Sequence, residues 1–172
     1  MERDELRRTQ GPLKQKYTDD PRAAVVTLRA TGQLDDEQVS CSVETGRALV
    51  EAGLHPATGG DGSLACSGDM LLQALVACAG VTLRSVATNR GLDVRGSVSA
   101  EGDLDFRGTL GVDRDAPVGF TEIRLSFDLG GSASDADLDA LLKATERYCV
   151  VLQTLAHSPQ IMVCRTAGTG AD

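Results

Sequence analysis

The order of predicted elements places this chain in the α+β class, with a mostly antiparallel sheet. Strand-like segments come first, one long apolar helix follows, and further strands, a second helix and a last strand complete the chain. A regular alternation of strand and helix is absent, so the parallel sheet of an α/β protein is not expected. The 172 residues suit one domain with a real core.

The two ends of the chain look different from its centre. Residues 1–21 are dense in charge and predict a loosely attached polar arm, followed by a single domain over residues 22–168 and a disordered tail over 169–172. The N-terminal residues lack the apolar run of a signal peptide. The most apolar stretch, Met70–Val81, is too short to span a bilayer. We therefore expect a cytoplasmic protein with no membrane partner, whose cysteines are thiols.

The segments before the long helix carry a strand pattern. Strands are predicted over Val25–Leu28, Val39–Glu44 and Ala48–Val50. The middle one alternates apolar and polar residues, as a half-buried strand does. Residues 55–68 are rich in glycine and small polar residues, which predicts a loop.

The strongest helical signal in the sequence covers Asp69–Asn89. Apolar residues recur there at spacings of three and four, Ser67 is the predicted N-cap, and Gly91 is the predicted stop. Apolar positions extend beyond a single stripe. Such a helix is expected to be buried on most sides, inside the domain or between subunits.

The remaining elements follow the long helix. Strands are predicted over Val94–Glu101, Asp105–Gly111 and Thr121–Leu129. The third alternates strictly, with apolar residues on one face and charged or hydroxyl residues on the other, which is typical of an antiparallel strand with one wet face. Ser134 caps a second helix that runs to about Tyr148, and Ile161–Val163 is predicted to be the closing strand.

Composition excludes several classes of function. The chain has 17 Lys and Arg against 25 Asp and Glu, a net charge of −8, which argues against a nucleic-acid partner. Only two histidines occur, and the five cysteines form no CxxC pair, so no metal site is expected. The glycine-rich Gly59–Gly62 lacks the residues of a phosphate-binding loop and predicts a flexible turn.

Three short stretches carry a resemblance to a known family. Gly68–Cys78, Glu101–Gly108 and Glu146–Val150 resemble the OsmC/Ohr family of thiol-dependent peroxidases. In that family a cysteine on a long central helix is paired with a second one near the start of a later helix, and Cys78 and Cys149 match these positions. The resemblance implies an OsmC-like fold, with antiparallel sheets around two central helices, in an intertwined homodimer.

The resemblance also implies roles for particular residues. Cys78 would attack a small organic hydroperoxide, and Cys149 would resolve the product. No bound cofactor is expected, and an external dithiol would be the electron donor. Asp69 matches an acidic residue in the first turn of the central helix, and Arg47, or alternatively Arg29, matches an arginine from the N-terminal strands that holds the thiolate. The chain departs from the family's usual Cys-Pro pair, since Val150 follows Cys149.

The residue types support the same chemistry without the family. Peroxide is attacked by thiolate, so the attacking cysteine needs a lowered pKa. Cys78 lies mid-helix, where the dipole of its own helix contributes little, so an arginine is expected beside it, oriented by a carboxylate such as Asp69. Attack would leave a sulfenic acid on Cys78, which Cys149 would trap as a disulfide. Apolar neighbours such as Leu75 and Val81 would receive the organic part of the substrate.

Other interpretations remain open at this point. Taken alone, Cys78 is more often a small core residue than a nucleophile. Cys41 and Cys164 follow strand patterns and are expected in the core, while Cys66 is either incidental or part of the redox relay. The alternative to a peroxidase is a non-catalytic OsmC-like protein that binds a small apolar ligand or senses oxidation.

Overall fold

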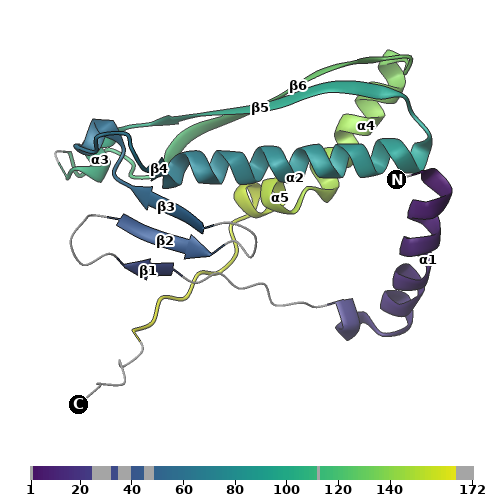
Figure 1. Ribbon diagram of the computed structural model, residues 1–172, viewed down its shortest axis with the longest axis horizontal. Helices are drawn as coiled ribbons and strands as arrows, with labels where there is room; N and C mark the ends of the chain where they lie inside the picture. The colour runs from purple at the N-terminus through teal and green to yellow at the C-terminus, as the bar shows by residue number, and fades with distance from the viewer. Residues whose placement is uncertain (1, 25–31, 35–39, 45–48, 112, 166–172) are drawn as a thin grey trace.

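The structure is a computed structural model that describes residues 2–24, 32–34, 40–44, 49–111 and 113–165 (Figure 1). Its α-helices are α1 (Arg3–Asp19), α2 (Ser67–Arg90), α3 (Phe106–Thr109), α4 (Asp135–Tyr148) and α5 (Val150–Ala156). Its strands are β1 (Gly32–Leu34), β2 (Ser40–Glu44), β3 (Leu49–Gly53), β4 (Ala65–Cys66), β5 (Val94–Leu104) and β6 (Phe120–Gly131). Mixed helix and sheet of this kind confirms the predicted α+β class.

The strands form two sheets. The first has the order β1-β2-β3-β4, antiparallel except for the parallel pair β3 and β4, and the second is the antiparallel pair β5 and β6. The strands predicted around Cys41 and at Ala48–Val50 are confirmed as β2 and β3. The strand predicted over Val25–Leu28 lies outside the described residues.

Helix α2 is the centre of the fold. Its buried residues, Leu75, Ala79, Leu83 and Ala87, recur every fourth position and so form one face. Figure 1 shows β5 and β6 covering one side of α2, with α5 against another. The N-cap of α2 is Cys66, one residue before the predicted cap Ser67, and its C-cap is Gly91, whose φ of 71° is the left-handed conformation that glycine favours.

Helix α2 is apolar over more of its length than the sequence suggested. Its 24 residues include an 18-residue window with a mean hydropathy of 1.6, long and apolar enough to cross a membrane by length and composition. The apolar part of α2 is therefore longer than the 12-residue stretch Met70–Val81. Here the helix packs on β5, α4 and α5 through one face, and 22% of the window is buried within the chain.

The β5–β6 hairpin confirms two of the strand predictions and corrects a third. Along β6, Ile123, Leu125 and Phe127 are half-buried while the residues between them are exposed. The strand predicted over Asp105–Gly111 is wrong. Residues 106–109 form the short helix α3 instead, because the Asp105 carboxylate accepts a hydrogen bond from the Arg107 backbone N–H and caps a turn.

The second helix is confirmed as α4, and the closing strand is not. The Ser134 hydroxyl accepts a hydrogen bond from the Asp137 N–H, as predicted for an N-cap. Ile161, Met162 and Val163 are 78%, 86% and 94% exposed and adopt no strand. A strand needs a neighbour to satisfy its backbone groups, and no described strand pairs with this segment.

The segment expected as a loosely attached arm contains the helix α1, despite Gly11 and Pro12. Acidic residues in its first turn and Lys16 in its last turn complement the helix dipole. The Arg7 side chain donates hydrogen bonds to the side-chain oxygen and the carbonyl of Asn89, at 3.2 and 3.4 Å. The arm is therefore attached to the end of α2. The domain limits at residues 22 and 168 stay a prediction, and the predicted tail lies outside the described residues.

Candidate active site

Cys149 lies where α4 ends and α5 begins. It is both the C-cap of α4 and the N-cap of α5, with an extended backbone (φ −73°, ψ 108°) that separates the two helices. Its side chain is fully buried against Leu75 and Ala79 of α2. The backbone N–H groups at the start of α5 have no partner within their own helix, and they surround this position.

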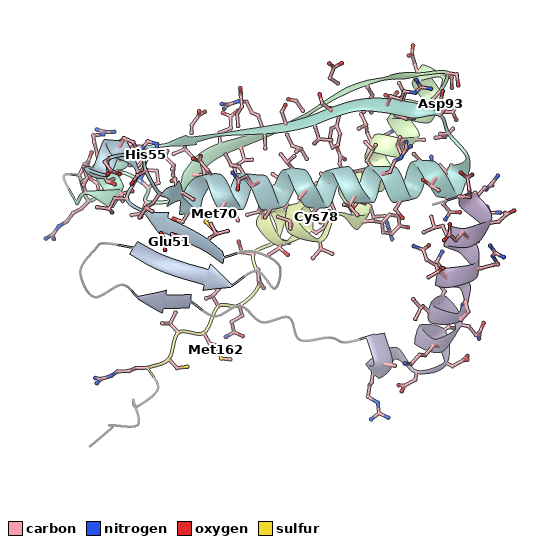
Figure 2. All side chains as sticks on the ribbon, in the orientation of Figure 1. Glu51, His55, Met70, Cys78, Asp93 and Met162 are labelled. Carbon is pink, nitrogen blue, oxygen red and sulfur yellow. The ribbon has the colours of Figure 1, made fainter. Side chains whose placement is uncertain are left out.

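Cys78 lies on α2, on the side that faces α5, and is half-buried (Figure 2). The backbone N–H groups of Val151 and Val150, the Cys149 thiol and the Thr82 hydroxyl lie near its sulfur and favour its thiolate form. The two cysteines thus come together, and both are free thiols. The sequence matched them only through a family resemblance, and the packing of α5 on α2 makes them neighbours.

The surroundings of the two thiols separate their pKa values. Burial raises the pKa of Cys78, but the donors from Val151, Cys149, Val150 and Thr82 outweigh it and bring the pKa below its usual value. Burial raises the pKa of Cys149 above its usual value, and the neighbouring Cys78 sulfur raises it further. The pair therefore loses its first proton at Cys78, while Cys149 keeps its own and donates it to the thiolate.

The N-terminus of α5 supplies the stabilisation that the sequence analysis sought from an arginine. The dipole of α2 contributes little at Cys78, but the second helix α5 begins beside the sulfur. Arg47 and Arg29 both lie outside the described residues, so their part in the site stays a prediction. The sequence did contain a signal for these backbone N–H donors. Cys149 directly follows the helical pattern of α4 and is therefore placed at a helix end.

Asp69 does not lie beside the two thiols within this chain, and its expected role in orienting an arginine stays a prediction, because Arg47 and Arg29 lie outside the described residues. Asp69 lies nine residues before Cys78 on the same helix, which is about 13 Å along the axis and half a turn around it. Asp69 is exposed and borders cavities near Leu72, Val76 and Ala100. Within this chain its carboxylate therefore faces away from the thiol pair.

The other cysteines are also apart from the pair. Cys66 is the half-buried N-cap of α2, beside Gly68 and Phe120. Cys164 is exposed, so the expectation that it lies in the core is wrong. Cys41 lies in β2, but its side chain is outside the described residues. Within the described ranges, no group of three or more His, Cys, Asp or Glu side chains is placed to hold a metal ion.

The lowered pKa predicts the pH dependence of alkylation. Iodoacetamide reacts with thiolates, so the rate at Cys78 is expected to rise with pH and reach half its maximum at a lower pH than that of an ordinary thiol, because its pKa is lowered. Cys149, with its raised pKa, should lag behind it. Peptide mass spectrometry after timed alkylation measures both rates in one sample, with N-acetylcysteine as the reference thiol. A midpoint for Cys78 at or above that of the reference would contradict the prediction.

Fold and site together define a class of protein: an α+β domain with one thiol on its central helix and a second at the junction of two later helices. The family profile described as OsmC-like protein matches residues 60–163, which is more than half of the chain. This chain belongs to the OsmC-like family. A search of curated protein sequences finds no match.

Several solved structures have the same fold. The OsmC-like protein from Mycoplasma pneumoniae has a TM-score of 0.62 at 16% identity, over 77% of this chain and 89% of that one. An organic hydroperoxide resistance protein from Elizabethkingia anophelis has a TM-score of 0.61 at 14% identity, over 78% and 91%. The organic hydroperoxide resistance protein OhrB of Bacillus subtilis gives 0.53 at 15%, over 78% and 94%. At these identities the likeness shows the fold.

Proposed function

We propose that this protein is a cysteine-based peroxidase that reduces organic hydroperoxides, with Cys78 as the attacking and Cys149 as the resolving thiol. The observation that carries the proposal is the contact between a half-buried thiol of lowered pKa and a fully buried thiol of raised pKa. A peroxidase needs this asymmetry, because one sulfur must be a thiolate within reach of peroxide while the other waits as a thiol. The names of the hydroperoxide resistance proteins that share the fold agree with it.

The proposed cycle has three balanced steps. The Cys78 thiolate attacks one peroxide oxygen, the O–O bond breaks, and the departing alkoxide takes a proton to become an alcohol, leaving a sulfenic acid on Cys78. The Cys149 thiol then attacks that sulfur, forming a disulfide and releasing water. An external dithiol returns two electrons and two protons to restore both thiols. The cycle needs no bound cofactor, and it suits the reducing cytoplasm.

The neighbourhood of the thiols favours a substrate with an apolar part. Val81, Tyr148 and Val150 are 72%, 62% and 69% exposed, and each lies within three residues of one of the two cysteines in sequence. Leu75, by contrast, is buried against Val151 and Leu155 and is not free to bind a ligand. We therefore expect these exposed side chains, and not Leu75, to contact the apolar part of the substrate.

The preference between peroxides tests the proposed function. We expect tert-butyl and cumene hydroperoxide to exceed hydrogen peroxide in kcat/KM by about tenfold to a hundredfold, since each buried methylene contributes about 0.8 kcal/mol that hydrogen peroxide lacks. The measurement is steady-state peroxide consumption with dithiothreitol as donor. Equal efficiency for all three would contradict an apolar substrate site, and no consumption of any would favour the ligand-binding or sensing alternative.

We also propose that two copies associate through α2. Leu71, Ala74 and Ala77 are exposed and form an apolar stripe along the N-terminal half of the helix. Only 22% of the apolar window of α2 is buried within the chain, although a helix of this composition is normally covered. Small alanine side chains allow two helix backbones to approach closely, so the α2 helix of a second copy fits against this exposed stripe.

Light scattering after gel filtration tests the dimer. We expect a particle of two 18.0 kDa chains, and we expect Ala77→Arg to convert it to a monomer, because an arginine would lie unpaired in the apolar contact. Ser99→Arg, at an exposed position of β5, is the matched control and should leave the dimer unchanged. A monomeric wild-type protein would contradict the proposal.

A further inference from the structure

The chain turns from α4 into α5 at a single residue, Cys149. The Cys149 N–H donates to the Thr145 carbonyl of α4, and the Cys149 carbonyl accepts from the Gln153 N–H of α5, both at 2.9 Å. One helical hydrogen bond therefore holds the backbone of Cys149 on each side. Its extended conformation, with a ψ of 108°, prevents the two helices from forming one continuous helix.

This break leaves one N–H and one carbonyl without their helical partners. In a continuous helix the Val150 N–H would donate to the Glu146 carbonyl, four residues earlier. Among the described residues these two groups are not bonded to each other, and the Cys149 thiol does not cap α5. The Val150 N–H lies near the Cys78 sulfur instead. The break at Cys149 thus makes a backbone donor available to the reactive thiol.

The side chain of Gln153 bonds the carbonyl that Val150 leaves unpaired. Its amide nitrogen Nε2 donates to the Glu146 carbonyl oxygen at 2.7 Å, across the junction of the two helices. In the described part of the chain no other side-chain hydrogen bond joins α4 to α5. A carbonyl that already has this donor does not compete for the Val150 N–H.

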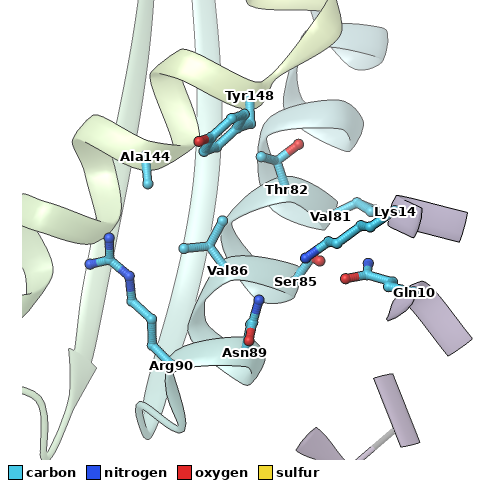
Figure 3. A pocket seen from close by; sticks show the side chains of 10 residues that line it. All are labelled: Gln10, Lys14, Val81, Thr82, Ser85, Val86, Asn89, Arg90, Ala144 and Tyr148. Atoms are coloured by element: carbon cyan, nitrogen blue, oxygen red, sulfur yellow. The ribbon is translucent and has the colours of Figure 1, made fainter. Parts of the chain in front are cut away.

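Helix α4 is held against α2 independently of this bond. Leu141 of α4 is buried in one cluster with Leu83 and Ala87 of α2. Figure 3 shows Tyr148, in the last turn of α4, and Thr82 of α2 lining the same groove of about 640 Å³. Because α4 is fixed on α2, the way α5 leaves α4 decides how the Val150 N–H lies relative to the sulfur on α2.

We propose that Gln153 is a positioning residue for the two thiols: its side-chain amide replaces the Val150 N–H at the Glu146 carbonyl and so leaves that N–H facing Cys78. The inference rests on the proposed function, because it concerns the same thiols, but the contact forms without peroxide. The titratable group that faces Cys78 in the described residues is the Cys149 thiol, and the Val150 N–H adds a donor that does not titrate.

Alkylation of Cys78 by iodoacetamide tests the inference without peroxide, so its outcome is separate from that of the peroxidase assay. Gln153→Met keeps the length of the side chain and removes the donor. We expect the rate at neutral pH to fall about threefold to tenfold, because the thiolate loses a donor, and the rate at a pH that ionises both thiols to stay unchanged. Peptide mass spectrometry of the full-length protein measures both rates. An unchanged rate at neutral pH would overturn the proposal, as would an equal fall at both pH values, which indicates structural damage.

Two further variants test whether Gln153 acts through the Val150 N–H. Val150→Pro removes this N–H at the first position of α5, where proline suits a helix and the extended residue before it suits a proline. It should lower the neutral rate by a similar factor, and adding Gln153→Met should cause no further fall. Thr154→Val is the matched control, since the Thr154 hydroxyl bonds the Val150 carbonyl within α5 and joins no second helix. Additive falls in the double variant, or an equal fall in the control, would contradict the proposal.

Discussion

Cys78→Ser is expected to abolish hydroperoxide consumption, with a loss of at least about a thousandfold in kcat/KM while the fold is retained. The thiolate at this position is held by the N–H groups of Val150 and Val151 and by the Cys149 thiol. A serine hydroxyl in the same place stays protonated at neutral pH and is a far weaker nucleophile. The assay is peroxide consumption with a dithiol donor, beside circular dichroism and thermal unfolding to check the fold.

A matched control exists on the same helix. Cys66 is also a half-buried free thiol of this chain, but it lies at the N-cap of α2 and not beside Cys149. Cys66→Ser should therefore retain nearly full activity, as should Cys164→Ser in the exposed tail. If Cys78→Ser kept its activity while Cys66→Ser lost it, the chemistry would belong to Cys66 and the proposed assignment would be wrong.

Cys149→Ser is expected to complete one turnover and then stall. Without the resolving thiol, the sulfenic acid on Cys78 has no partner and is oxidised further to the sulfinic and sulfonic acids. Intact-mass spectrometry after peroxide treatment should show the variant gaining about 16 Da for each added oxygen, and the wild type losing about 2 Da as the disulfide forms. If the wild type also gained only oxygens, Cys149 would not form a disulfide with the oxidised Cys78, and its proposed role would be wrong.

The buried position of Cys149 requires a second variant. Its side chain is fully enclosed by Leu75 and Ala79, so a serine there places a hydroxyl in an apolar site and lowers stability by about 1–3 kcal/mol. Cys149→Ala removes the thiol without adding a polar group. Both variants should show the same added oxygens on Cys78, and agreement between them separates the loss of the resolving thiol from any damage to the core.

Local periodicity made much of the fold predictable. The four-residue recurrence of apolar positions predicted α2, the strict alternation of β6 predicted its buried face, and the hydroxyl of Ser134 predicted the start of α4. These signals depend only on neighbours in the sequence. One error has a local cause, since the Asp105 cap makes a turn where a strand was predicted, and another has a tertiary cause, since residues 161–163 have a strand pattern but no described strand to pair with.

The sequence by itself determined the element types and, through resemblance, the two cysteines that matter. Only the tertiary structure decided what surrounds them. The start of α5 lies against Cys78, which lowers its pKa, while the half-turn between Asp69 and Cys78 directs that carboxylate away from the thiols. The physical reason is that a thiol's pKa depends on the donors and charges near it in space, and a helix that begins 72 residues later in the chain supplies them here.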